Sequence, residues 1–362
     1  MIPLSRSLLG PEEASALADV LNSGRLVQGE RVAQFEALVA GRIGRKHAIA
    51  VANGTAALEL ALQALDVRAG ADVLVPDLTW PSPGHAVISV GARPVLVDVD
   101  AREWNARGDA MLAARTPLTA AAIVIDQFGC PSRVAEVERA LPELPLIVDA
   151  ACSLGSHDGE LACGRRGLIA CLSFHPRKVL TTGEVGMCLT DDDAIAERLR
   201  VLRNHGQLTP GVFRRAAGNE RMSELAAAIG AVQVGRLPGM LRERQLLAAR
   251  YARALAACAP QELPEGARGN HQTFGVVLPP HIARDEALAA LRARGVEAGK
   301  LSYALHSLPQ FGASAEQARA AGRSFPNATR LAEQGIALPL YVGLTEAEQT
   351  HVIESLRHVL AS

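Results

Sequence analysis

Residues 144–190, LPLIVDAACSLGSHDGELACGRRGLIACLSFHPRKVLTTGEVGMCLT, contain three short apolar runs separated by glycine-containing segments. The runs are LPLIVD (144–149), LIACLSF (168–174) and VGMCLT (185–190). Each has the length and the residue types of a buried strand. Asp149 ends the first run, so a carboxylate lies at the carboxyl end of a predicted central strand. In open α/β sheets that edge is where ligands bind.

Four further apolar runs precede this stretch and alternate with helical patterns. In residues 55–65, Leu58, Leu62 and Leu65 recur at helical spacing directly after Asn53-Gly54. Strands that alternate with helices are typical of βαβ units on a mainly parallel sheet, so we predict an α/β fold. The four runs are AIAV (48–51), ADVLV (71–75), ARPVLVDV (92–99) and AAIVI (121–125).

The remainder of the chain predicts a second, smaller domain. From about residue 191 to 257 the pattern is long and helical, and we expect Pro238-Gly239 to break it. Strand and helix signals then resume in TFGVVL, DEALAALRARG and LTEAEQTHVIESLRHVL. Because single cores stop growing near roughly 250–300 residues, we expect a large domain over residues 1–240 and a smaller one over 241–362.

The charge balance argues against two classes of partner. The chain has 362 residues, of which 37 are basic and 38 acidic, so no net field attracts nucleic acid or an anionic membrane. No stretch approaches the roughly 18 apolar residues of a membrane span, and the N-terminus lacks a signal-peptide pattern. We expect a cytoplasmic protein that holds any anionic ligand in a local site.

The six cysteines form no C-x-x-C pair and show no metal-ligand spacing. They are typical of small buried hydrophobic residues in a reducing compartment, and no metal is expected. They are Cys130, Cys152, Cys163, Cys171, Cys188 and Cys258.

Three features carry possible chemistry, although each has an ordinary structural explanation. Residues 53–56, Asn-Gly-Thr-Ala, lie between a strand and a helix, where free N–H groups can bind phosphate, but many such turns need glycine for steric reasons. Asp149 is about as well explained as a helix cap. Lys178, in SFHPRKVLTTGE, is by itself a solvated charge.

Together the three features match the needs of an enzyme that uses pyridoxal 5′-phosphate. Such an enzyme needs a lysine for the Schiff base, an acid beside the pyridinium nitrogen and a phosphate cup on one α/β scaffold. Lys178 released from the cofactor would be the base for a proton shift. Trp80 could stack on the cofactor ring, or could be a partly buried anchor below a proline turn.

Motifs along nearly the whole chain resemble the DegT/DnrJ/EryC1/StrS family of pyridoxal-phosphate-dependent sugar aminotransferases. The N-terminal segment, IPLSRSLLGPEEASALADVLNSGRLVQGERVAQFE, is also similar to the family's opening. Several independent motifs in the right order are far more specific than any one of them. The motifs are NGTAAL (53–58), VDAACSLGS (148–156), SFHPRKVLTTGEVGM (173–187), LRNHG (202–206), GNERMSELAAAIGAVQ (218–233) and LPLYVGLTEAEQ (338–349).

The resemblance implies a fold-type-I transferase, with a mainly parallel seven-stranded sheet, a smaller C-terminal α/β domain and a homodimer that shares its active sites. It implies that Lys178 forms the Schiff base and that Asp149 contacts the pyridinium nitrogen. Family members that dehydrate sugars carry histidine in place of this lysine, so aminotransfer is favoured. The remaining cofactor positions are implied to be Gly54, Thr55 and Ala56 at the phosphate, Ser173 beside them, Trp80 on the ring, Cys152 near the phenolic oxygen, and Asn219 from the partner subunit.

Four positions depart from the family pattern. Cys152 stands where the family often has Gln, His or Glu, and a thiol cannot strongly hydrogen-bond the phenolic oxygen. Glu220 replaces an aromatic residue, Val185 interrupts a Glu-Gly-Gly sequence, and Arg25 stands where an aromatic residue is common. Because substrate or partner could sense each position, the resemblance specifies the acceptor less closely than the reaction.

The resemblance implies transfer of an amino group from L-glutamate, or from glutamine, to the ketone of a nucleotide-linked keto-deoxysugar in amino-sugar biosynthesis. The pathway could supply a surface polysaccharide or a secondary metabolite. His205, Tyr303 and His306 match positions near the substrate pocket. The two histidines are explained equally well as loop residues whose hydrogen bonds are satisfied and that have no role in binding. Two alternatives remain at this stage: amination of a keto-cyclitol, and a non-catalytic regulator that binds the cofactor.

Overall fold

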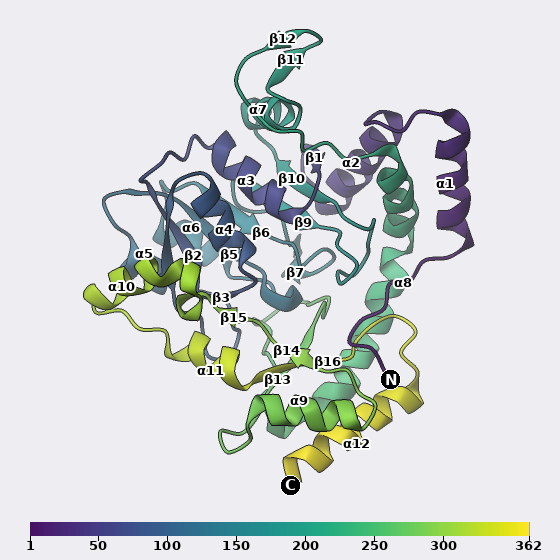
Figure 1. Cartoon of the computed structure of the whole chain (residues 1–362), viewed down its shortest axis with the longest axis vertical. Helices are drawn as coiled ribbons and strands as arrows, with labels where there is room; N and C mark the ends of the chain where they lie inside the picture. The colour runs from purple at the N-terminus through teal and green to yellow at the C-terminus, as the bar shows by residue number, and fades with distance from the viewer. Residues whose placement is uncertain (362) are drawn as a thin grey trace.

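All seven predicted runs form strands of one sheet in the computed structural model, which describes residues 1–361 (Figure 1). All neighbouring strands from β4 across the sheet to β9 are parallel, whereas β10 is antiparallel to both of its neighbours, β9 and β1. The α/β fold with a mainly parallel seven-stranded sheet is therefore confirmed. In spatial order the strands are β1 (His47–Val51), β10 (Gly186–Thr190), β9 (Ile169–Ser173), β6 (Leu146–Asp149), β5 (Thr119–Ile125), β2 (Asp72–Pro76) and β4 (Arg93–Val97).

Alternate residues of each strand contribute to two hydrophobic cores, one on each face of the sheet. In β5, Ile123 and Ile125 belong to one core, and Ala122 and Val124 belong to the other. This alternation follows from the two-residue period of a strand. The first face is covered by α3 (Gly54–Ala64), α4 (Ser82–Ser89) and α7 (Asp193–Arg203), and the second by α2 (Glu30–Ile43), α5 (Gly108–Ala114), α6 (Val134–Ala140) and part of α8 (Glu224–Ala254).

The expected helix break at Pro238-Gly239 is wrong, because α8 continues without interruption to Ala254. A proline inside a helix removes one backbone hydrogen bond and costs about 3 kcal/mol or more. Burial on both sides of the proline offsets this cost. Leu237 is packed in the core of the large domain, and Tyr251 is packed in the core of the C-terminal region. The α1 helix (Pro11–Ser23) also lies against α8 (Figure 1).

A third hydrophobic core lies in the C-terminal region, at the bottom of Figure 1. There α9 (Arg284–Ala293) and α12 (Glu346–Ala361) contribute to a core shared with the second half of α8. By contrast, α10 (Gly312–Ala320) and α11 (Pro326–Gln334) return to the large core. The small antiparallel sheet consists of β13 (Phe274–Val277), β16 (Gly335–Leu338) and β14 (Gly299–Lys300).

Short strands and 3-10 helices lie in the loops of the large domain and the C-terminal region. The hairpin β11–β12 projects from the top of the molecule in Figure 1, and β3 pairs with β15 between the large domain and the C-terminal region. Among residues 1–361, no helix combines the length and the apolar character needed to cross a membrane. The short elements are β3 (Leu78–Thr79), η1 (Gln127–Gly129), β7 (His157–Asp158), β8 (Leu161–Ala162), β11 (Gln207–Thr209), β12 (Val212–Phe213), η2 (Ala256–Cys258), β15 (Tyr303–Ala304), η3 (Leu305–Ser307) and η4 (Pro309–Phe311).

Candidate active site

A cleft of about 760 Å³ lies where the carboxyl ends of β5, β6 and β9 meet the C-terminal region. Loops from both parts of the chain line it, which fits the rule that open α/β sheets bind ligands at this edge. The structure brings most of the predicted cofactor residues together here. The lining includes Gly54, Thr55, Ala56, Trp80, Asp149, Cys152, Ser173 and Lys178.

The N-terminus of α3 presents two free backbone N–H groups to this cleft. Asn53 caps the helix, and its Oδ1 accepts a hydrogen bond of 2.9 Å from the N–H of Ala56. Within residues 1–361 the N–H groups of Gly54 and Thr55 have no acceptor. A helix N-terminus with unpaired N–H groups favours a phosphate. Gly54 and Thr55 are therefore free to donate to an anion, whereas the Ala56 N–H already bonds Asn53.

Glycine at position 186 lets β10 approach the turn that begins α3. A Cβ atom at Gly186 would lie 2.1 Å from the carbonyl oxygen of Asn53, which is far inside van der Waals contact. Gly54 also packs closely, since a Cβ there would be 3.0 Å from the Cβ of Ser173. The hydroxyl of Ser173 thus lies beside the helix N-terminus. The Thr55 hydroxyl is 2.8 Å from the hydroxyl of Ser82.

Asp149 lies at the end of β6, and its residue is only 7% exposed. Its Oδ1 accepts a hydrogen bond of 3.0 Å from the N–H of Ala151. Burial raises the pKa of Asp149 to about 6, although the Ala151 N–H and the charge of Lys178 oppose the shift. A buried carboxylate of this kind would be stabilised by a cationic group placed against it.

A second buried carboxylate, Asp126, anchors the loop after Asp149 by a hydrogen bond to Ser153. Its Oδ1 accepts hydrogen bonds from the N–H and the hydroxyl of Ser132, and its Oδ2 accepts one of 2.7 Å from the hydroxyl of Ser153. Burial raises the pKa of Asp126. The sequence does not single out Asp126, because its partners lie 6 and 27 positions away along the chain.

Lys178 lies in the loop between β9 and β10, and its Nζ donates to the Sγ of Cys152 at 3.1 Å. Five of the six cysteines are buried as expected, but Cys152 is half-buried and lines the cleft. The expectation that all six act as buried hydrophobic residues is therefore wrong for Cys152. It follows Asp149 closely in the loop after β6, which exposes its thiol to the lysine.

Trp80 and Tyr303 meet at the rim of the cleft. Their rings are in edge contact, with centroids 5.6 Å apart, and Trp80 is 59% exposed. The pairing of β3 with β15 sets this contact, because Tyr303 is opposite Thr79 in the register. Trp80 lines the cleft and is free to stack on a planar ligand, whereas Tyr303 supports it from the C-terminal region.

His306 contacts a buried carboxylate and does not line the cleft. Its Nδ1 lies 2.6 Å from Oδ2 of Asp77, which is completely buried, and its ring stacks on Phe325. The hydrogen bond to Asp77 raises the pKa of His306. Asp77 was not identified from the sequence, since its partner lies 229 positions away.

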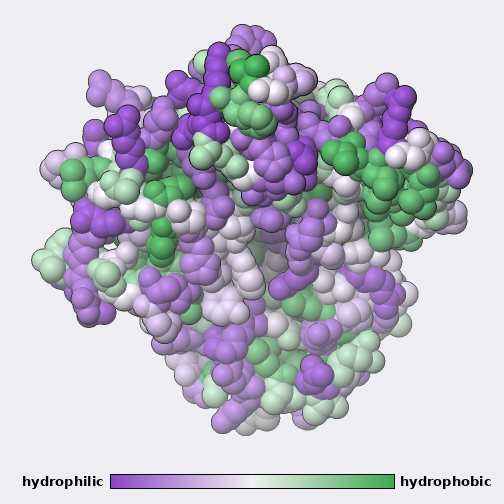
Figure 2. All heavy atoms as spheres, turned by 45° about the horizontal axis from the view of Figure 1, so that its top comes forward, coloured by the Kyte–Doolittle hydropathy of each residue, from purple (hydrophilic) through white to green (hydrophobic). Residues whose placement is uncertain are grey.

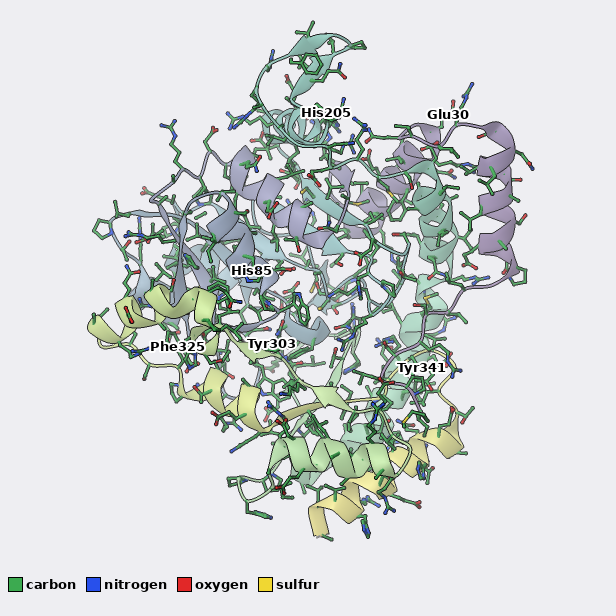
Figure 3. All side chains as sticks on the ribbon, viewed as in Figure 1. Glu30, His85, His205, Tyr303, Phe325 and Tyr341 are labelled. Carbon is green, nitrogen blue, oxygen red and sulfur yellow. The ribbon has the colours of Figure 1, made fainter. Side chains whose placement is uncertain are left out.

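His205 and Asn219 also lie outside the cleft of the single chain. Figure 3 shows His205 at the base of the projecting hairpin, far from Tyr303. Its N–H donates to the carbonyl of Gly218 at 2.8 Å, so its exposed ring adjoins the segment that carries Asn219. Asn219 is exposed, and Glu220 next to it does line the cleft.

Charged residues not identified as ligand contacts also line the cleft. They are Glu59 on α3, Glu184 before β10, and Arg177 beside Lys178. Glu184 lies 3.6 Å from Nε2 of His175. Burial lowers the pKa of His175, and Glu184 opposes this shift. The motif at 173–187 contains Arg177 and Glu184 but does not say what they contact, and no sequence pattern distinguishes Glu59 from an ordinary surface charge.

Comparison with known families matches residues 8–357 to the DegT/DnrJ/EryC1/StrS aminotransferase family. A similar curated protein is dTDP-4-dehydro-2,3,6-trideoxy-D-glucose 4-aminotransferase of Saccharopolyspora spinosa. It is 32% identical over 379 residues, which cover 99% of this chain and 96% of that protein. The match thus extends over both the large domain and the C-terminal region.

Solved structures agree with this match. The aminotransferase TlmJ of Streptoalloteichus hindustanus is 31% identical and superposes with a TM-score of 0.92, covering 100% of this chain and 99% of its own. DesV of S. venezuelae, solved with a ketimine intermediate, is 28% identical with a TM-score of 0.90, covering 97% of this chain and 95% of its own.

Proposed function

Because this chain belongs to the DegT/DnrJ/EryC1/StrS aminotransferase family, and is a pyridoxal-phosphate-dependent aminotransferase, we propose that it moves an amino group from L-glutamate, or L-glutamine, to a nucleotide-linked keto-deoxysugar. The observation that carries this proposal is the convergence of Lys178, Asp149 and the N-terminus of α3 on one cleft. These are the three groups that the cofactor requires.

The residues of the cleft fit pyridoxal phosphate. The free N–H groups of Gly54 and Thr55, with the nearby Ser173 hydroxyl, would hold its phosphate. The buried carboxylate of Asp149 would pair with the pyridinium nitrogen, and Trp80 would cover the ring. When bound, the cofactor supplies an electron sink and carries the amino group from donor to acceptor.

Lys178 has two roles in this proposal. Its Nζ would hold the cofactor covalently, and the amine, once released, would act as the base that moves a proton during the transfer. The Sγ of Cys152, which Nζ contacts at 3.1 Å, keeps the amine directed toward the loop after Asp149. The anionic form of Asp149 would favour protonation of the pyridinium nitrogen.

The relative named for a dTDP-linked keto-sugar supports a nucleotide-linked acceptor. In the cleft, Glu59, Glu184 and Glu220 offer carboxylate oxygens, which accept hydrogen bonds from sugar hydroxyls. We assign these three residues to the sugar end of the acceptor. Tyr303 supports Trp80, and His306 contributes indirectly through Asp77.

The test begins with the purified enzyme and pyridoxal phosphate. We expect a visible absorption band from the lysine-linked cofactor, and its loss on adding L-glutamate. Lys178→Ala should remove the band and lower turnover by about 10²–10⁴-fold or more, whereas the exposed Lys300→Ala should leave both unchanged. A band that ignores glutamate but responds to glutamine would reassign the donor.

The acceptor is identified by a substrate panel. Enzyme loaded with the amino group is offered dTDP- and UDP-linked 4-keto-6-deoxysugars and a free keto-cyclitol. Amination of a nucleotide-linked sugar supports the proposal, and amination of the cyclitol alone would reject it.

We also propose a homodimer with shared active sites. Asn219 is exposed and does not line the cleft of its own chain, so its side chain is available to the cleft of a second chain. Hydrophobic residues gather at the top and the upper right of Figure 2, where Figure 1 places the hairpin and α1. They include Val212 and Phe213 on the hairpin, and Leu21, Leu26 and Val27 near α1.

Light scattering should give twice the mass of the chain. Mixed dimers that carry Lys178→Ala on one chain and Asn219→Ala on the other should keep one intact site. If such dimers are as defective as the Asn219→Ala homodimer, the assignment of Asn219 to the partner's site is wrong.

Two further proposals concern the whole chain. The separate C-terminal core supports a division into residues 1–240 and 241–362, with α8 crossing the boundary. The six free thiols support a cytoplasmic location, because oxidising compartments favour disulfides. Limited proteolysis and cell fractionation test these two proposals.

A further inference from the structure

Arg177 lines the cleft directly beside Lys178, and among residues 1–361 its guanidinium makes no hydrogen bond or ion pair. Its backbone, in contrast, is held on both sides. The N–H of Arg177 donates to Nδ1 of His175 at 3.1 Å, and Nε2 of Gln272 donates to the carbonyl of Arg177 at 2.8 Å. The main chain is therefore fixed while the charged group remains available for a ligand.

The charges around the cleft make this arginine distinctive. Of the lining residues within 1–361, Arg177 and Lys178 are the only arginine and lysine. The amine of Lys178 is committed to the cofactor under the proposed function. Glu59, Glu184 and Glu220 also line the cleft and would repel an anion. An anionic part of a substrate thus has one permanent cation to bind.

We propose that Arg177 binds the diphosphate of the nucleotide-linked acceptor. This inference rests on the proposed function and extends it to a specificity-determining residue. The guanidinium presents a planar set of donors that matches phosphate oxygens in a bidentate way.

Position favours the diphosphate over the carboxylate of the amino donor. Arg177 is exposed, whereas Lys178 is half-buried. The carbon that receives or loses nitrogen must reach Lys178, and the α-carboxylate of the donor is attached to that carbon. In a nucleotide-linked sugar, the diphosphate is separated from the ketone by the sugar ring, so it lies toward the mouth of the cleft where Arg177 is exposed.

The experiment measures binding of UDP and dTDP to the enzyme loaded with pyridoxal phosphate, by calorimetry, for the wild type, Arg177→Ala and Arg177→Lys. Arg177→Ala should weaken binding of both nucleotides by about 10-fold or more, which is the usual effect of losing a charge-assisted hydrogen bond. Arg177→Lys should retain part of the affinity, since it keeps the charge without the fork. Uridine, which lacks the diphosphate, should bind the wild type and Arg177→Ala equally.

Two controls separate this role from a loss of structure. Arg68→Ala removes an exposed arginine whose side chain makes no hydrogen bond or ion pair within residues 1–361 and does not line the cleft, and it should not change nucleotide binding. The reaction of Arg177→Ala with L-glutamate, followed by the cofactor's absorbance, should keep the wild-type KM and rate.

The outcomes also distinguish this inference from the proposed function. If the wild type binds UDP or dTDP and Arg177→Ala binds it equally well, the role of Arg177 is rejected while the acceptor class stands. If Arg177→Ala raises the KM for glutamate and leaves nucleotide binding unchanged, Arg177 is a donor ligand and the inference fails. If the wild type binds neither nucleotide and aminates a keto-cyclitol, the proposed acceptor fails, and the role of Arg177 fails with it.

Discussion

The Nζ of Lys178 lies 3.1 Å from the Sγ of Cys152, and Cys152 is the one cysteine of the six that is not buried. The most accessible thiol of the chain is therefore in contact with the lysine proposed to hold the cofactor. Burial strongly raises the pKa of Cys163 and Cys171, which keeps those thiols protonated and unreactive. Chemical labelling of the Cys152 thiol can consequently report whether a ligand occupies the cleft beside Lys178.

We predict that N-ethylmaleimide labels the cofactor-free enzyme at Cys152 before any other cysteine. Bound pyridoxal phosphate should slow this labelling, because it occupies the cleft that exposes the thiol. Mass spectrometry of peptides measures both effects, with Cys152→Ser as the control that should lose the fast label. Equal labelling of Cys258, which is buried, would contradict the accessibility seen here.

The pKa of Asp149, raised to about 6, makes the stability of the cofactor-free enzyme depend on pH. Below the ordinary pKa of aspartate, the Asp149 carboxyl is protonated in both the folded and the unfolded chain, so no buried charge destabilises the fold. Above about pH 6 the carboxyl is ionised in the folded chain, and this buried charge lowers the free energy of unfolding by its full amount of about 3 kcal/mol. Asp149→Asn should therefore stabilise the cofactor-free protein more at pH 7 than at pH 5.

Urea unfolding of the wild type and of Asp149→Asn at the two pH values measures this difference. The exposed Asp19→Asn is the control and should show no such dependence on pH. Asp149→Asn should also bind pyridoxal phosphate more weakly, because the amide cannot pair with the pyridinium nitrogen. A pH-independent difference between Asp149→Asn and the wild type would contradict the burial of an ionisable carboxyl at this position.

The contact between His306 and Asp77 should also depend on pH, in the opposite direction. Because the hydrogen bond to Asp77 raises the pKa of His306, its contribution to stability is fully present below the ordinary pKa of histidine. That contribution is lost as the pH rises through the raised value. We expect His306→Gln to cost about 1–2 kcal/mol at pH 6 and less at pH 9.

Thermal unfolding at both pH values tests the stability effect, and the KM for the acceptor tests its consequence for the cleft. Asp77 precedes β3, and His306 follows β15, so loosening this contact should disturb the seat of Trp80 and Tyr303. His351→Gln, which alters an exposed histidine on α12, is the control. If the two variants respond identically to pH, the contact with Asp77 does not control the titration of His306.

Gly186→Ala should damage the turn that we propose to bind phosphate, because its Cβ would lie 2.1 Å from the carbonyl oxygen of Asn53. We expect a loss of about 1–3 kcal/mol in the free energy of unfolding, and faster release of pyridoxal phosphate on dialysis. Gly41→Ala, at an exposed position of α2 with no atom within 4 Å of the new Cβ, should instead stabilise the helix by about 0.5–1 kcal/mol. Retention of the cofactor by Gly186→Ala would show that the turn can move without loss of binding.

The sequence was sufficient to predict the seven strands of the main sheet, the helix after Gly54, and the places of Asp149 and Lys178. These features depend on periodicity and turn chemistry, which act over a few residues and are visible in the order of the chain. The family motifs then supplied the reaction. The same local reasoning failed at Pro238, because burial in two separate cores outweighs the intrinsic cost of a proline in a helix.

Only the tertiary structure decided which side chains of distant loops meet. His306 bonds Asp77 across 229 positions, Gln272 holds the backbone of Arg177 across 95, and Cys152 faces Lys178 across 26. Such contacts depend on how strands are ordered in the sheet and how the C-terminal region returns to it. A single side chain in one sequence carries no signal of a partner that folding brings close, so the availability of Arg177 and the exposure of Cys152 emerge only once the whole chain is packed.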